Sequence, residues 1–247
     1  MSLIKGFVMS LGMFSIIPVS PNSWDNKYMP LVVPSLPLVG LLIGLIWYGL
    51  ALLSLSLPMP IQSVIVLFVP FILSGFIHAD GYMDTADAVF SRRGLEEKKR
   101  ILKDPNTGAF AVIAIVGVIL FQFSTVQAIV DAQISTLVFI FIPAISRCVA
   151  GVAVLNLKPF FEAGYYVSLR NGAKICHTVF ICVFAALLLL IAWFMPGVSA
   201  WPLLTAILVG ILITVYLYKQ FGGMSGDLCG CIITVGEFAA LLCLALV

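Results

Sequence analysis

The chain has 247 residues, of which 62% are hydrophobic and only 10% are charged, and its mean hydropathy is +1.17. Soluble domains carry about 25% charged residues, so this composition excludes an ordinary soluble protein. The formal net charge of +2 gives no reason to expect a nucleic-acid partner. The composition therefore predicts an integral membrane protein.

The N-terminal segment contains Lys5 and a short apolar run that is interrupted by Pro18 and Pro21. The run is shorter than the ~20 residues that a spanning helix needs. It superficially resembles a secretory signal, but no small-residue cleavage site precedes a soluble domain. We therefore expect an interfacial or re-entrant helix that is retained.

Seven further segments have the apolar character and approximate length of spanning α-helices. Proline-containing turns separate some of them, as at Pro58 and Pro60 before the second and at Pro196 before the sixth. We expect an all-α, polytopic membrane helix bundle of about seven transmembrane helices, forming a single integral membrane domain over residues 1–247. The predicted spans are 32–57, 61–79, 108–130, 134–157, 175–195, 200–218 and 229–247.

The basic residues indicate how these spans are oriented. If the loop at 80–107 is cytoplasmic, the alternation of seven spans places the N-terminus and the loops at 158–174 and 219–228 on the same side. These segments hold 12 of the 13 basic residues, and the three opposite turns hold none. The pattern predicts that the 80–107 loop faces the cytoplasm. The 12 residues are Lys5, Lys27, Arg92, Arg93, Lys98, Lys99, Arg100, Lys103, Lys158, Arg170, Lys174 and Lys219.

Charge is concentrated between residues 80 and 104, where 25 residues hold six of the 11 carboxylates and six of the 13 Lys and Arg. Asp80, Asp84 and Asp87 fall at i, i+4 and i+7, so a helix places them on one face. Such oxygen ligands suit Mg²⁺, with Mn²⁺ as the alternative, and Mg²⁺ usually completes its shell with substrate phosphates. We therefore predict a metal-dependent phosphate site, with residues 78–110 as the cytoplasmic catalytic segment.

Other polar residues border this triad. His78 either orients a carboxylate, contacts phosphate or is an ordinary helix-end histidine. The run 91–103 predicts a short amphipathic helix whose basic side chains are solvated and touch anionic lipid. Lys103, Asp104 and Asn106 precede a helix that starts near residue 108, whose free N–H groups favour phosphate. We expect Lys103 and Asp104 to act in catalysis and Asn106 to bind substrate.

Two more groups of polar residues lie far along the chain. Ser225 and Asp227 open the last span on the predicted cytoplasmic side, either as helix caps or as substrate-binding groups. Arg147 and Glu237 lie inside predicted spans, where ionisable groups are costly and usually functional. For Arg147 the alternatives are a structural ion pair and contact with a substrate phosphate. Glu237 is either a ligand, a base or the partner of Arg147.

Together these motifs resemble the cobalamin synthase family, the adenosylcobinamide-GDP ribazoletransferases, over essentially the whole chain. The most specific part combines HADG at 78–81, DTAD at 84–87, KD at 103–104 and GAF at 108–110. PLVGLLIG at 37–44 and GGMSGD at 222–227, followed by Glu237, fall in the expected order.

The resemblance implies a step in the final stage of vitamin B12 biosynthesis, at the cytoplasmic membrane of a prokaryotic cell. A ribose hydroxyl of α-ribazole, or of its 5′-phosphate, attacks the cobinamide-side phosphorus of adenosylcobinamide-GDP, and GMP leaves. The acidic triad would hold Mg²⁺ against the pyrophosphate, and Lys103 and Arg147 would stabilise developing negative charge. The implied partners are these substrates and the lipid bilayer, with other cobalamin-pathway enzymes and a homo-oligomeric copy as further candidates.

Two other classes compete with this interpretation. CDP-alcohol phosphotransferases and membrane prenyltransferases also combine aspartate clusters with Mg²⁺, but Tyr82-Met83 follows Asp80-Gly81 here, and a second aspartate-rich loop is missing. A transporter would use Arg147 and Glu237 to bind its solute, and paired broken helices in two halves would favour it. The sequence has no such internal symmetry.

Overall fold

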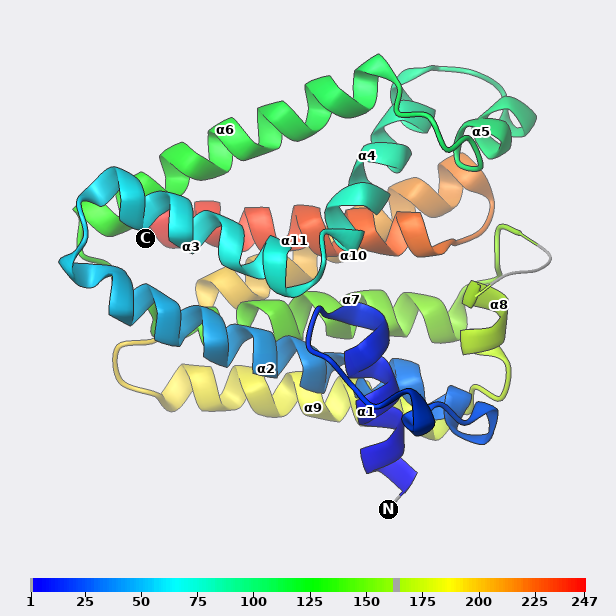
Figure 1. The fold of residues 1–247 in the computed structure, drawn as a ribbon, viewed down its shortest axis with the longest axis horizontal. Coiled ribbons are helices and arrows are strands. Elements are labelled where there is room, and N and C mark those ends of the chain that lie inside the picture. The colour runs from blue at the N-terminus through cyan, green and yellow to red at the C-terminus, as the bar shows by residue number, and fades with distance from the viewer. Residues whose placement is uncertain (1, 162–164) are drawn as a thin grey trace.

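The computed structural model describes residues 2–161 and 165–247, which form helices and turns with no β-strand among them (Figure 1). The α-helices are α1 (Ser2–Phe14), α2 (Val32–Leu53), α3 (Met59–Leu73), α4 (Ile77–Phe90), α5 (Leu95–Ile101), α6 (Ala109–Asp131), α7 (Ile142–Asn156), α8 (Tyr165–Arg170), α9 (Ile175–Phe194), α10 (Trp201–Phe221) and α11 (Gly226–Leu246). Within the same residues, the 3₁₀ segments between them are η1 (Pro21–Ser23), η2 (Asn26–Leu31), η3 (Ser54–Ser56) and η4 (Thr136–Ile140).

The predicted polytopic membrane bundle is confirmed. Within the described residues, six helices are long and apolar enough to cross a membrane, and the bent pair α3 and α4 raises the number to seven if it is one span. The short apolar helix α1 lies across the long helices in Figure 1, as expected for an N-terminal helix that does not span.

The second predicted span differs from the structure. A continuous helix over 61–79 was expected, but α3 ends at Leu73 and α4 starts at Ile77 in a direction 88° away. Gly75 and Phe76 have φ angles of 62° and 60°, in the left-handed region that ends a helix. The hydropathy of the sequence did not predict this break, because the apolar run continues through the turn. As a result His78 belongs to the transverse helix and not to the end of a span.

Close backbone contacts hold the centre of the bundle together. Gly40 and Gly44 on α2 face the backbone of residues 139–144, and a Cβ atom at Gly44 would collide with the carbonyl of Ile140. Small residues of this kind allow membrane helices to approach closely. One turn further, Trp47 stacks on Phe139 with ring centroids 4.2 Å apart. Its indole N–H donates to the carbonyl of Val66 at 2.7 Å, so it also ties α3 to α2.

The two ends of the bundle differ in character. Figure 1 shows α5, α8 and the α10–α11 turn at one end, which we call the basic end, and the α2–α3, α6–α7 and α9–α10 connections at the other. The basic end carries the loops that the sequence analysis places in the cytoplasm, and the C-terminus lies at the opposite end. Residues 162–164 of the predicted 158–174 loop lie outside the described residues.

A glycine exchange tests the helix contact at the centre of the bundle. Gly44→Ala should destabilise the fold by about 1–3 kcal/mol, because the added methyl group overlaps the backbone near Ile140. Gly49→Ala, on the same helix but with no atom near its Cβ position, should be neutral or stabilising by up to about 1 kcal/mol. Unfolding titrations of both variants in detergent make the comparison, and equal stability would contradict the packing described.

Candidate active site

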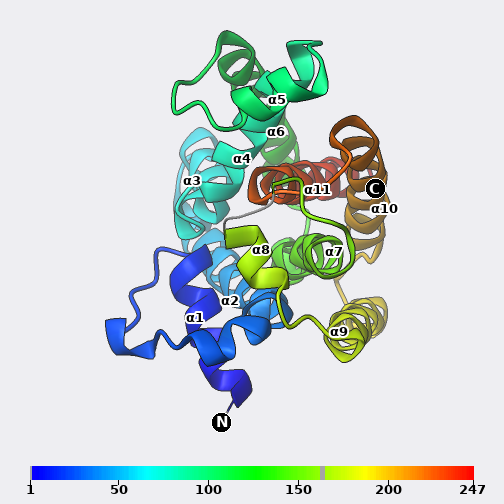
Figure 2. The same ribbon diagram turned by 90° about the vertical axis from the view of Figure 1, so that its right-hand side faces the viewer.

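Helix α4 crosses the bundle between α11 and α6 and carries the predicted acidic triad (Figure 2). Its contact with α11 depends on two glycines. A Cβ at Gly81 would come within 2.8 Å of the Cα and carbonyl oxygen of Asp227, and a Cβ at Gly230 would come within 3.0 Å of the carbonyl of His78. The close crossing therefore brings the triad, from one part of the sequence, beside Asp227 from another.

Four carboxylates gather at this crossing. The carboxylate of Asp84 is repelled by those of Asp80, Asp227 and Asp87, and that of Asp227 is repelled by Asp80. Asp80 is exposed, and the other three side chains are half-buried. The structure thus brings Asp227, predicted as a helix cap or a substrate-binding group, beside the triad of α4. Such a concentration of like charge requires a positive partner to be favourable at neutral pH.

Asp87 has a second contact that the sequence analysis did not foresee. Its Oδ1 accepts a hydrogen bond from the N–H of Ala111 at 3.4 Å, and its carboxylate fills the space beside Gly108, where a Cβ would collide with it. Asp87 therefore lies at the N-terminus of α6 and satisfies part of the positive helix end. This is the helix end that the sequence analysis assigned to substrate phosphate.

The donor set of this cluster suits Mg²⁺ or Mn²⁺, because all four groups are carboxylates. Among the described residues no three His, Cys, Asp or Glu side chains already have the arrangement of a metal site. Asp80, Asp84 and Asp227 nevertheless lie within electrostatic reach of one another, and none of the three is fully buried. A cation there would offset their mutual repulsion, so the residues present fit a divalent metal.

His78 on α4 and Ser225 at the start of α11 both border the α4–α11 contact. The His78 side chain is buried, its carbonyl accepts from Thr234 Oγ1 at 3.0 Å, and its Nε2 has no hydrogen-bond partner among the described residues. Ser225 is the N-cap of α11, since its Oγ accepts from the N–H of Leu228 at 3.3 Å and lies 3.4 Å from Asp227 Oδ2. The capping alternative for Ser225 is therefore confirmed.

The residues predicted on the loop before α6 form a separate group. Lys103, Asp104 and Asn106 are exposed. Asp104 Oδ1 accepts from the backbone N–H of Asn106 at 3.0 Å and from its Nδ2 at 2.8 Å, and these bonds lower the pKa of Asp104. Because these hydrogen bonds stabilise its charged form, the carboxylate of Asp104 is a weaker base. The hydrogen bonds between Asp104 and Asn106 belong to a local turn of the chain.

The basic helix α5 rests on aromatic side chains. Lys98, expected to be solvated, is only 7% exposed. Its Nζ donates to Gln220 Oε1 at 2.7 Å and lies 5.4 Å from the ring centroid of Phe221, so the expectation was wrong for this residue. Desolvated cation–π contacts explain how an ammonium group is buried without a carboxylate. Lys99 and Lys103 lie over Phe160 and Phe161, at 5.6 Å and 4.7 Å. No periodic signal in the sequence marks these aromatic partners.

Arg147 and Glu237 pair with each other inside the bundle. Arg147 Nη1 donates to Glu237 Oε1 at 2.7 Å and to the carbonyl of Pro143 at 3.0 Å, and Ser146 Oγ also donates to Glu237 at 2.9 Å. Arg147 is 1% exposed and Glu237 is 13% exposed. The structure thus contains the ion pair that was one of the two alternatives. Arg147 also lies within electrostatic reach of His78.

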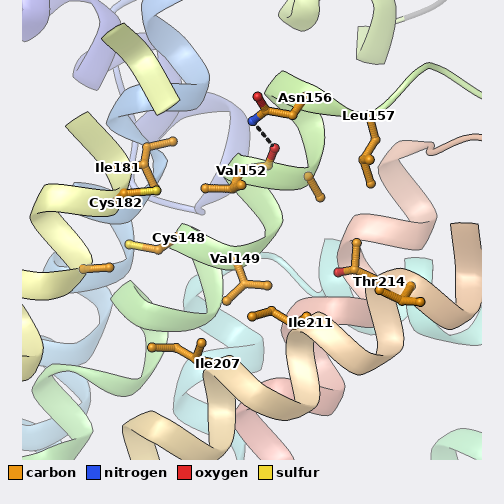
Figure 3. A pocket seen from close by; sticks show the side chains of 13 residues that line it. Cys148, Val149, Val152, Asn156, Leu157, Ile181, Cys182, Ile207, Ile211 and Thr214 are labelled. Carbon is orange, nitrogen blue, oxygen red and sulfur yellow. Dashed lines mark hydrogen bonds between the residues drawn. The ribbon is translucent and has the colours of Figure 1, made fainter. Parts of the chain in front are cut away.

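An apolar groove of about 340 Å³ lies between α7, α9 and α10, well separated in sequence from the acidic cluster (Figure 3). Its lining consists of aliphatic side chains and cysteines with Asn156 and Thr214. Figure 3 shows Val149 and Val152 of α7 between residues of the two neighbouring helices. The groove contains no carboxylate, lysine, arginine or histidine, so it offers no acid–base or metal chemistry.

The fold and the cluster define a polytopic membrane protein with an acidic site where a transverse helix meets the last span. Residues 6–245 match the family described as cobalamin-5-phosphate synthase, and the chain belongs to that family. The adenosylcobinamide-GDP ribazoletransferase of Clostridium perfringens (strain SM101 / Type A) is 31% identical over 246 residues, which cover 98% of each chain.

Other relatives carry the same name. The protein of Clostridium botulinum (strain Alaska E43 / Type E3) is 33% identical over 97% of this chain and 96% of its own, and that of Geobacillus thermodenitrificans (strain NG80-2) is 29% identical over 94% and 92%. No solved structure matches the chain. The family assignment removes the CDP-alcohol phosphotransferase, prenyltransferase and transporter alternatives.

Removing one partner tests the buried ion pair. Arg147→Met should lower the free energy of unfolding by about 3–5 kcal/mol, because it leaves the carboxylate of Glu237 buried without a counter-charge. The double variant Arg147→Met/Glu237→Gln should recover part of that loss. Glu96→Gln, which breaks the exposed pair with Lys99, should cost less than about 1 kcal/mol. If unfolding titrations gave Arg147→Met the same small cost, the pair would not be the structural contact described.

Proposed function

We propose that the chain transfers the cobinamide phosphoryl group of adenosylcobinamide-GDP to a ribose hydroxyl of α-ribazole or α-ribazole 5′-phosphate. The observation that carries the proposal is the meeting of Asp80, Asp84 and Asp87 from α4 with Asp227 from α11. It occurs in a chain whose relatives are named for this reaction.

The bond changes require a base and neutralisation of charge. The hydroxyl oxygen forms a bond to the cobinamide-side phosphorus, the pyrophosphate P–O bond breaks, and GMP departs with its electron pair. The proton of the hydroxyl goes to a carboxylate of the cluster. Asp84 is the best placed for this, because its partial burial and then the negative charges of its neighbours raise the pKa of its carboxyl to about 6. Asp104 is the weaker candidate, because Asn106 holds its charged form.

The same carboxylates would hold Mg²⁺, with Asp80 as the exposed member of the triad and Asp84 and Asp87 half-buried beside it. Bound Mg²⁺ supplies neutralisation of the charge that builds on the pyrophosphate oxygens. Lys103 and Asn106, on the exposed loop before α6, would contact substrate phosphate. Arg147 and Glu237 would influence the site indirectly. Their ion pair lies inside the bundle, and the guanidinium of Arg147 is within electrostatic reach of His78.

The acidic cluster is tested by a charge-removing exchange. Asp84→Asn should lower kcat by at least about 100-fold, corresponding to about 3 kcal/mol of lost transition-state stabilisation. Asp131→Asn, at the exposed end of α6 remote from α4, should keep normal turnover. The measurement is GMP release and cobalamin formation by folded protein in liposomes, across a Mg²⁺ titration. Near-normal turnover by Asp84→Asn at saturating Mg²⁺ would show that the cluster is not the reaction centre.

We also propose that the basic end faces the cytoplasm of a prokaryotic cell, where nucleotides and Mg²⁺ are available. The positive-inside pattern supports this orientation. A reporter fused after Val247 tests it, because the C-terminus lies at the opposite end. Alkaline phosphatase, which is active only outside the cytoplasm, should be active in this fusion, and green fluorescent protein should be dark when exported through the general secretory route. The reverse result would place the site on the outer face.

A further inference from the structure

A cavity of about 370 Å³ lies directly behind the acidic cluster, and we call it the inner cavity. Side chains from α1, α2, α4, α7, α8 and α11 line it. Most of the lining is apolar, as with Phe14, Val33 and Val154. Asp80 and Asp227 belong both to its wall and to the carboxylate cluster. The inner cavity is therefore continuous with the proposed reaction centre.

His78 is the unexplained polar group in this wall. Its side chain is 8% exposed, and its Nε2 has no hydrogen-bond partner among the described residues. Buried polar atoms in folded proteins almost always have partners, and leaving one unpaired costs about 1–3 kcal/mol. Tyr166, another polar member of the wall, is already directed at the carbonyls of Ala153 and Val154, at 3.4 Å and 3.5 Å. The free nitrogen of His78 thus points to a bound group that pairs with it.

We propose that the inner cavity binds the aromatic base of the acceptor nucleoside, with the His78 ring as its polar contact; this inference rests on the proposed function. A ribazole base is a fused, largely apolar bicycle with few polar atoms. Ligand pockets of this volume are typically apolar with a small number of placed polar groups. A base seated here would bring its ribose to Asp80 and Asp227, the two cluster members in the cavity wall, and so beside Asp84, which takes the proton of the hydroxyl.

The other parts of the substrates fit the inner cavity less well. Guanine presents several donors and acceptors at its edges, and a mostly apolar wall would leave them unpaired. A corrin ring with its amide side chains is too large for about 370 Å³. The donor is therefore assigned to the exposed side of the cluster, and the acceptor to the buried side.

Two valines on α7 provide a matched test. Val154 lines the inner cavity, and Val152 lines the apolar groove of Figure 3. Val154→Phe should raise the KM for α-ribazole by at least about tenfold and leave the KM for adenosylcobinamide-GDP within about twofold, since about 1.4 kcal/mol of lost binding is tenfold. Val152→Phe should change neither KM. A rise in the donor KM, or no change in either, would overturn the assignment.

Two further measurements keep the test decisive if Val154→Phe does not fold. Val154→Ala enlarges the inner cavity and should shift acceptor preference toward nucleosides with a bulkier base. His78→Phe keeps an aromatic side chain but removes the nitrogens, and it should weaken α-ribazole binding about tenfold, whereas His177→Phe on α9 should not. Unchanged acceptor preference and unchanged binding by these variants would contradict the proposal.

The outcome is separable from the proposed function. Release of GMP by the unsubstituted protein tests the reaction itself, and equilibrium binding of radiolabelled α-ribazole to the protein in liposomes without donor tests the inner cavity. If the unsubstituted protein turns over but the Val154 and His78 variants show unchanged KM, binding and preference for the acceptor, only the cavity assignment is overturned. Absence of both turnover and α-ribazole binding overturns both.

Discussion

The crossing of α4 over α11 is the contact on which the rest of the site depends. Gly81 and Gly230 let the two backbones approach so closely that a side chain at either position would meet the opposite helix. This approach places Asp227 beside the triad of α4 and so concentrates negative charge in one place. The repulsion within the cluster costs folding free energy, which a bound cation would offset. The same four carboxylates therefore provide the proposed cation site and destabilise the fold when no cation is bound.

The surroundings of this crossing are organised to hold it. The break at Gly75 and Phe76 turns α4 out of the direction of α3, and without that turn the triad would not reach α11. Asp87 fixes the far end of α4 to the start of α6. Deeper in the bundle, the hydrogen-bonded pair of Arg147 and Glu237 ties α7 to α11. Because charges are costly in lipid, this pair also keeps both groups turned inward.

Much of the fold and part of the candidate site could be predicted from the sequence. Long apolar runs with basic loops on one side predicted the spans, because lipid imposes both their length and their charge asymmetry. The spacing of Asp80, Asp84 and Asp87 predicted their shared face, since helical periodicity is local. The 88° turn before α4 was missed because the apolar pattern runs through it. The burial of Lys98 was missed for another reason: its partners Gln220 and Phe221 are remote in the chain and reach it only through the folded bundle.

The most direct test of this account is Mn²⁺ binding to the purified protein, followed by electron paramagnetic resonance with Mg²⁺ as competitor. If α4 and α11 form one cation site, Asp84→Asn and Asp227→Asn should each weaken Mn²⁺ binding by at least about tenfold, equivalent to about 1.4 kcal/mol. Asp104→Asn, on the exposed loop, should bind Mn²⁺ as the unsubstituted protein does. Equal Mn²⁺ binding by all three variants and the unsubstituted protein would contradict the shared site.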